Sequence, residues 1–296
     1  MKVPLFIVSL VALGLLSALA LHPGGDALSG RSSSAQWRSV FLNRDAATAY
    51  SVFLNVAGAA SAESAHTLSH DIGAILYERY GLDGLRYCSD DFAFGCYHGL
   101  AGRFIEEQGP AGITQLTAVC EKYRPLNCLH GVGHGLMAYM GNDHLNEAII
   151  YCPTIDSSPC TTGIFMEYFL NTINPTDNAR IVAYDDADPT APCAVLTEMQ
   201  YMGACHYNLP KLWRWWISQD TDGTADRFVS IGLLCEKVRD HAYRASCFAG
   251  AGALAAPLAE YDERATMDLC DTMPIDGRDP CKTEALRVMK QNKLGL

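Results

Sequence analysis

Two histidines four residues apart, His130 and His134, stand in the stretch Cys128–Gly135, which also contains three glycines. Residues at this spacing lie on the same face of a helix, so both imidazoles would point to one place. Paired histidines of this kind can clamp a metal ion, because a neutral imidazole nitrogen is a good ligand. The spacing indicates a metal site, a polar catalytic cleft without a metal, or a packing motif in which histidines bridge helix ends by hydrogen bonds.

Histidines recur at two positions, two and six residues after a reference residue, in neighbouring segments of the chain. The reference residue is a cysteine in two of these segments and Ser64 in the segment before them. Equivalent positions of stacked repeats lie side by side, so these imidazoles should converge on one patch. Later segments carry other residues there, including Tyr207 and Lys211, which confines the predicted patch to the N-terminal half. The predicted metal ligands are His66, His70, His98, His130 and His134.

Two carboxylates stand one place further along, Asp71 and Glu167. Either could serve as a ligand, as a group that orients an imidazole, or as a general base. Imidazoles in the first turn of a helix feel the positive end of the helix dipole, which favours their neutral, ligating form. A set of nitrogen and oxygen donors suits zinc, copper or iron and does not discriminate among them.

Glycine occupies a further shared position, three residues after the reference residue, in four segments. A residue without a Cβ is best explained there by close helix packing or by a backbone that approaches a ligand. These glycines are Gly99, Gly131, Gly163 and Gly250.

The twelve cysteines fall into six couples whose second members advance by 32 to 45 residues. A period in this range is typical of stacked helical hairpins. The segments between couples agree, because residues 97–107, 113–119, 129–140 and 145–151 each read as a short helix. We expect local pairing, although twelve cysteines permit many other connectivities. The couples are Cys88/Cys96, Cys120/Cys128, Cys152/Cys160, Cys193/Cys205, Cys235/Cys247 and Cys270/Cys281.

Cysteines separated by seven intervening residues that join successive helices in such a repeat resemble the disulfide-bridged Sel1-like repeats of bacterial secreted proteins. The resemblance is best over Cys88 to Cys160, and the pairs His98-Gly99 and His130-Gly131 are not part of the family pattern. It implies an all-α, right-handed solenoid of about six to seven short helical hairpins, and such repeats usually hold protein partners. A closed α/α toroid is the alternative architecture.

The chain begins with features of an exported protein. Residues 1–20 combine Lys2, an apolar run and a final A-x-A cleavage pattern, which predicts a signal peptide or, alternatively, an uncleaved membrane anchor. Residues 21–36 read as a flexible tether, residues 37–61 as an N-terminal capping helix or helix pair, and residues 62–291 as the repeat domain. Oxidised cysteines fit a secreted or periplasmic location.

The net charge of −11 argues against nucleic acid or an anionic lipid surface as the main partner. Membrane contact is then expected only through an uncleaved N-terminal segment. Three further features carry weaker signals: the insertion 174–192, the tryptophans of 213–216, for which packing is the default role, and the stretch 220–226, which reads as a turn with a helix cap more readily than as a calcium loop.

Two functions follow from the residues. The first is an exported metal-binding protein with its site on the concave face of the N-terminal half, and a metalloenzyme of unspecified reaction is its extension. In this function the five histidines are ligands, and Asp71 or Glu167 tunes them or moves protons. The second is a Sel1-like interaction scaffold with structural histidines and an unidentified protein or small-molecule partner.

Overall fold

The structure is a computed structural model that describes residues 28, 32–123, 125–152, 157–173, 187–197, 199–217 and 223–293. The predicted signal peptide, most of the predicted tether, residues 174–186 of the insertion and residues 220–222 of the candidate calcium turn lie outside this part of the chain.

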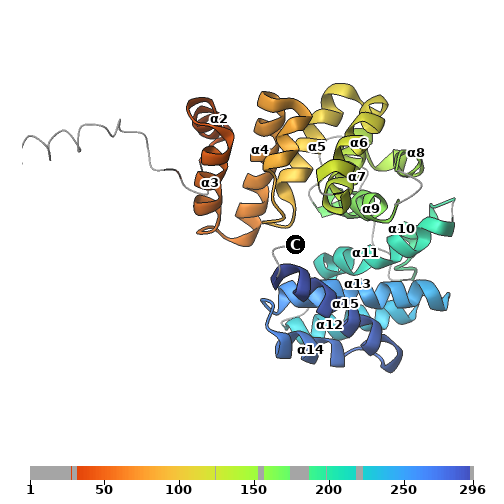
Figure 1. The fold of residues 1–296 in the computed structure, drawn as a ribbon. Coiled ribbons are helices and arrows are strands. Elements are labelled where there is room, and N and C mark those ends of the chain that lie inside the picture. Colours follow the sequence, from red (N-terminus) through yellow and green to blue (C-terminus); the bar gives the residue numbers. More distant parts are fainter. Residues whose placement is uncertain are drawn as a thin grey trace, which may run out of the picture.

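Seven helices form an inner column, and each packs against the next along the chain. They are α4 (Ala62–Tyr80), α5 (Gly95–Gln108), α7 (Pro125–Met140), α9 (Ser157–Ile173), α11 (Met202–Ile217), α13 (His241–Leu258) and α15 (Ile275–Lys293). In Figure 1 the array runs from α4 across to α9 and then turns back through α11, α13 and α15. The predicted all-α solenoid of paired helices is confirmed.

Shorter outer elements connect the inner helices. They are η1 (Gly81–Tyr87), α6 (Ile113–Tyr123), α8 (Leu145–Ile150), α10 (Ala191–Ala194), α12 (Thr224–Glu236) and α14 (Glu263–Asp271), with the short 3-10 turns η2 (Pro110–Gly112), η3 (Asn142–His144) and η4 (Met199–Tyr201). The four helices predicted between residues 97 and 151 are therefore present, with ends shifted by a few residues.

Six disulfides join each outer element to the inner helix that follows it, and all six predicted pairs are confirmed. The bridged cysteines are 8 residues apart in the first three pairs and 11 or 12 apart in the others. Closing so short a loop contributes about 2 to 3 kcal/mol by restricting the unfolded chain. Six disulfides also indicate that the protein matures in an oxidising compartment.

Two helices cap the N-terminal end of the array, α2 (Ser34–Asn43) and α3 (Ala46–Ala57). The first begins inside the range predicted as a tether, because the side chains of Ser33 and Gln36 form a capping box that satisfies free backbone N–H groups. Trp37 and Phe53 are fully buried and pack edge to face, which anchors the pair.

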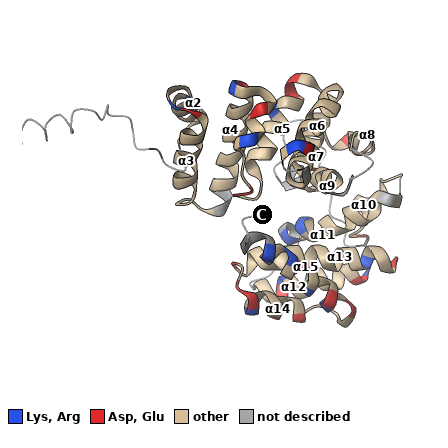
Figure 2. Cartoon of the chain, in the orientation of Figure 1, with Lys and Arg blue, Asp and Glu red and all other residues tan. Residues whose placement is uncertain are grey.

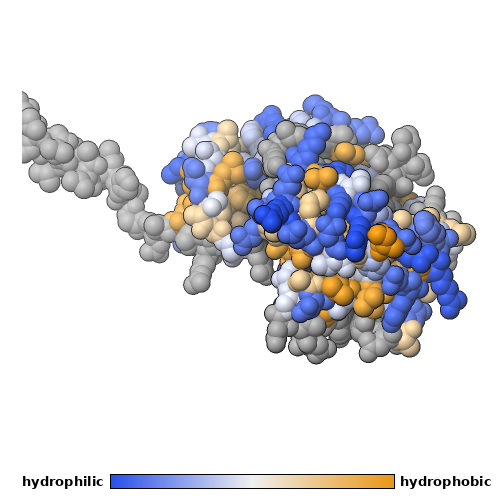
Figure 3. Space-filling model, turned by 90° about the horizontal axis from the view of Figure 1, so that it is seen from below, coloured by the Kyte–Doolittle hydropathy of each residue, from blue (hydrophilic) through white to orange (hydrophobic). Residues whose placement is uncertain are grey.

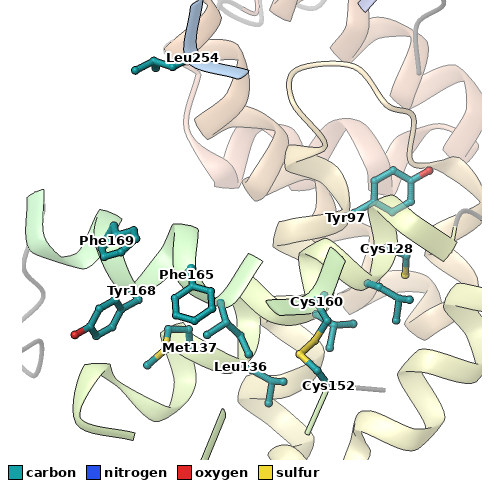
Figure 4. Close-up of a cluster of buried hydrophobic side chains, with 14 of the residues drawn as sticks. Tyr97, Cys128, Leu136, Met137, Cys152, Cys160, Phe165, Tyr168, Phe169 and Leu254 are labelled. Atoms are coloured by element: carbon teal, nitrogen blue, oxygen red, sulfur yellow. A yellow bond between two sulfur atoms is a disulfide. The ribbon is translucent and has the colours of Figure 1, made fainter. Parts of the chain in front are cut away.

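The core runs continuously between the inner and outer helices. Figure 4 shows part of it, in which Leu136 of α7, Phe165 of α9 and the bridge Cys152–Cys160 lie close to one another. Trp213 is also fully buried and donates its indole N–H to the carbonyl oxygen of Pro189, as its default packing role predicts.

The surface carries charges of both signs over the two halves of the array (Figure 2). On the face seen in Figure 3, apolar side chains are scattered among hydrophilic ones. Within the described ranges, no helix combines the length and apolar character that a membrane span requires.

Candidate metal centre

Five histidines from three consecutive inner helices meet on one side of the N-terminal half. Adjacent rings lie close together along the cluster: the centroids of His66 and His70 are 4.6 Å apart, those of His70 and His98 are 5.1 Å apart, and those of His130 and His134 are 4.9 Å apart. His98 also approaches His134, with centroids separated by 4.3 Å. The five predicted histidines therefore lie next to one another, and we call them the histidine cluster.

Glycines let the inner helices approach closely enough for the rings to meet. A Cβ at Gly99 on α5 would overlap the carbonyl oxygen of His70 on α4, and a Cβ at Gly163 on α9 would overlap that of His130 on α7. Close helix packing, one of the two predicted roles, is thus the reason for glycine here. Any larger residue would push apart helices that carry the imidazoles.

Oxygen acceptors face one ring nitrogen of three of these histidines. Nδ1 of His66 lies 2.8 Å from the carbonyl oxygen of Phe92, Nδ1 of His130 lies 3.3 Å from that of Pro159, and Nδ1 of His134 lies 2.9 Å from Oε2 of Glu167. A carbonyl or carboxylate oxygen only accepts, so each Nδ1 carries the hydrogen and donates it. In a neutral ring this leaves Nε2 with a bare lone pair, the form that binds a metal.

The nitrogens of the first group lie at distances that suit a shared ion. Nε2 of His70 lies 3.1 Å from Nε2 of His66 and 3.2 Å from Nδ1 of His98. Two nitrogens bound to one tetrahedral zinc are about 3.3 Å apart, since each Zn–N bond is about 2.0 to 2.1 Å. One donor atom from each of these three histidines lies within 4.8 Å of the other two, and the same holds for His98, His130 and His134.

Burial favours the neutral form of four rings of the cluster, those of His70, His98, His130 and His134. It is the main reason that the pKa of His70 and that of His134 are lowered to about 3, with a further contribution from the neighbouring His66. The pKa values of His98 and His130 are also well below the usual range, again chiefly through burial. The Nε2 atoms of His98 and His134 are buried and have no hydrogen-bond partner among the described residues. These two buried nitrogens are therefore left unsatisfied by the described residues, a state that costs free energy unless a ligand pairs with them.

The two candidate carboxylates have different surroundings. Glu167 accepts the His134 hydrogen bond, and burial raises the pKa of its carboxyl to about 6. Asp71 instead accepts a hydrogen bond of 2.9 Å from the hydroxyl of Ser34 on α2. Glu167 is thus the carboxylate that contacts an imidazole of the cluster.

The loop before α5 holds the carbonyl that orients His66. Its residues Phe92, Ala93 and Phe94 have φ values of 53°, 51° and 65°, a left-handed conformation that non-glycine residues rarely adopt. Such strained backbone persists only where the surrounding structure enforces it. Here the bridge Cys88–Cys96 closes the loop.

Comparisons with family models, with curated proteins and with solved structures find no significant match.

Lys211 extends the site beyond the residues predicted from the histidine pattern. It occupies on α11 the position that corresponds to His134, and its Nζ lies 3.6 Å from Sδ of Met166 and 3.0 Å from Oδ1 of Asn208. Burial lowers its pKa to about 8, and its charge contributes to the lowered pKa of His134. The charge of Lys211 thus acts on the histidine cluster from α11, although Met166 occupies the equivalent position between Lys211 and His134. The sequence pattern had confined the predicted patch to the histidines of the N-terminal half.

Proposed function

We propose that this protein binds a transition metal ion of the zinc, copper or iron class through His66, His70, His98, His130 and His134. The observation that carries the proposal is the set of Nδ1 hydrogen bonds to Phe92, Pro159 and Glu167, which leaves bare Nε2 lone pairs inside the cluster. Hydrogen bonds of this kind orient the histidines of known metal sites and fix their tautomer.

The neutral state of the rings supports the same proposal. Cationic imidazoles would repel a metal ion, whereas the lowered pKa values keep these donors ready to bind at neutral pH without first losing a proton. Three histidines with an open position form a common catalytic arrangement, in which the ion polarises a ligand or a bound water. Glu167, whose carboxyl has a pKa of about 6, is suited to accept a proton there, and this is the extension to a metalloenzyme.

We further propose that the chain is exported through the signal peptide at residues 1–20 and acts in a secreted or periplasmic setting. The six disulfides support this placement, because such bridges persist in oxidising compartments. An uncleaved N-terminal anchor that keeps the repeat domain outside the cytoplasm is the alternative. A small molecule is the expected partner of a metal centre.

The interaction scaffold remains the competing function, since solenoids offer long binding surfaces. The two functions differ in whether the histidines take up metal. The test is elemental analysis of oxidatively folded protein after exposure to zinc and desalting, for the native chain and for His130→Ala/His134→Ala. The double variant His144→Ala/His241→Ala is the matched control, because it removes two exposed histidines outside the cluster.

We expect retained zinc in the native chain and in the control, and a clear loss in the cluster variant. Negligible metal in all three, with correct folding shown by circular dichroism and absence of free thiols, would contradict metal binding and favour the scaffold. Repeating the loading with copper and iron salts determines which ion the site prefers.

A further inference from the structure

His98 is common to both groups of histidines that could hold an ion. It lies on α5, which packs between α4 and α7, and its ring therefore stands between the histidine pairs of those two helices. Its ring centroid is 5.5 and 5.1 Å from those of His66 and His70, and 5.3 and 4.3 Å from those of His130 and His134. Rings bound to one tetrahedral ion have centroids about 5 Å apart, so His98 is at ligand spacing from both pairs.

The two nitrogens of His98 have different surroundings. Nδ1 lies 3.2 Å from Nε2 of His70, within the first group. Nε2, on the opposite edge of the ring, is buried and finds no hydrogen-bond partner among the described residues. Nδ1 thus contacts the first group, whereas Nε2 has no protein partner among the described residues.

With one hydrogen on each of these rings, hydrogen bonds among the described residues do not satisfy every ring nitrogen. Because Nε2 of His66 is bare, its contact with His70 requires a hydrogen on His70 Nε2. The same hydrogen of His70 also faces Nδ1 of His98, so this Nδ1 must carry no hydrogen. The hydrogen of His98 is then on Nε2, which is buried and has no acceptor among the described residues. If the hydrogen of His98 were on Nδ1 instead, it would be donated to Nε2 of His70, which would then carry no hydrogen. The lone pairs of His66 Nε2 and His70 Nε2 would in that case face each other.

We propose that the histidine cluster holds two transition metal ions bridged by His98, one bound by His66, His70 and His98 Nδ1, the other by His98 Nε2, His130 and His134. This inference rests on the proposed function and specifies the number of ions and the role of each ring. The ions would lie about 6 Å apart across the bridging ring, as the length of the imidazole and two metal–nitrogen bonds require.

Bridging has a defined proton balance. The first ion binds Nδ1 of His98, which carries no hydrogen, so that ring releases no proton. The hydrogen on Nε2 of His70 moves through the solvent to Nδ1 of the same ring, which leaves Nε2 free to bind the ion. The second ion forms its bond to the other nitrogen while that N–H bond breaks and the proton passes to the solvent, which leaves an imidazolate. The negative charge of the imidazolate lies between the two cations and offsets their mutual repulsion.

Zinc stoichiometry of the oxidatively folded chain tests the proposal. We expect two ions per chain at saturation, one in His66→Ala/His70→Ala, one in His130→Ala/His134→Ala, and less than one in His98→Ala, where each group keeps only two histidines. The exposed pair variant His144→Ala/His241→Ala should retain two. Circular dichroism and thiol counting verify folding of each variant.

The possible stoichiometries separate the two proposals. If the native chain binds one ion and either double variant loses it, all five histidines share a single ion. This result would overturn the bridge and leave the proposed function standing. No ion in the native chain would overturn both. Two ions retained in His98→Ala would show two sites without a bridge.

Copper loading of the native chain provides a measurement that needs no variant. Two Cu(II) ions joined by an imidazolate couple magnetically, so we expect the integrated electron paramagnetic resonance signal to fall well below two spins per chain. Each double variant should instead show one full spin per chain. A signal of two independent spins in the native chain would overturn the bridge.

Discussion

Replacing Glu167 by glutamine should weaken metal binding by about 10- to 100-fold, the usual effect of changing a group that orients a metal-bound histidine. Glutamine keeps the size of the side chain and an oxygen that can accept from His134 Nδ1, so the variant removes the charge and little else. The expected loss corresponds to about 1.4 to 2.7 kcal/mol.

The geometry gives the same magnitude independently. The carboxylate oxygen lies 2.9 Å from Nδ1 of His134, so an ion on Nε2 would be about 7 Å away once the ring and the metal–nitrogen bond are added. Attraction between a dication and a carboxylate at that distance is about 1 kcal/mol in water and about 5 kcal/mol at an effective dielectric constant of 20. The Glu167 side chain is 19% exposed, which places the real value between these limits.

Competition against a coloured chelator at pH 7.5 measures the effect, because the Glu167 carboxyl, with a pKa of about 6, is ionised there. The matched control is Asp71→Asn, which changes the other predicted carboxylate and should leave affinity within about threefold of the native value, since its partner is Ser34. The difference between Glu167→Gln and the native chain should shrink below pH 6 as the native carboxyl takes up a proton. Unchanged affinity in Glu167→Gln together with weakened binding in Asp71→Asn would refute the reasoning.

Three further outcomes are expected. Lys211→Met should stabilise the fold at pH 7 by about 1 to 3 kcal/mol in urea titrations, because the lowered pKa shows that burying this charge costs free energy; lower stability would contradict this. Gly163→Ala should destabilise by about 1 to 3 kcal/mol and reduce metal uptake, whereas Gly102→Ala, whose Cβ meets open space, should be neutral or stabilising; equal effects would contradict the packing argument. Metal-free protein should lose stability as pH falls from about 6.5 toward 3, because His70 and His134 take up protons in the unfolded chain and not in the folded chain. Each of the two histidines lowers the free energy of unfolding by about 2 kcal/mol at pH 5. A melting temperature that stays constant over this pH range would contradict the prediction.

The sequence was sufficient for the architecture because cysteine couples and helix signals recur together along the chain, every 32 to 45 residues. Each local pairing joins a helix end to the next helix start, so the six bridges and the positions of the inner helices follow from the same count. The shared surface of the histidines follows as well, since equivalent positions of a repeat must stack.

Other parts of the site depend on contacts that residue types do not encode. Phe92 and Pro159 orient imidazoles through backbone carbonyls, which any residue could supply. The two carboxylates occupy equivalent positions, yet α2 packs against α4 and gives Asp71 a different partner. Lys211 occupies the position equivalent to His134 but is not a histidine, so a search for histidines alone could not include it.

The geometry of the histidine cluster depends on disulfides that form while the protein matures. Phe92 lies within the loop closed by Cys88–Cys96, Pro159 lies within the loop closed by Cys152–Cys160, and both carbonyls orient rings of the cluster. In the reduced chain these acceptors are not held, and twelve free thiols would compete with the imidazoles for the same soft ions. Under the proposed function, oxidation would therefore come before metal uptake, because ions bound to free cysteines would compete with disulfide formation.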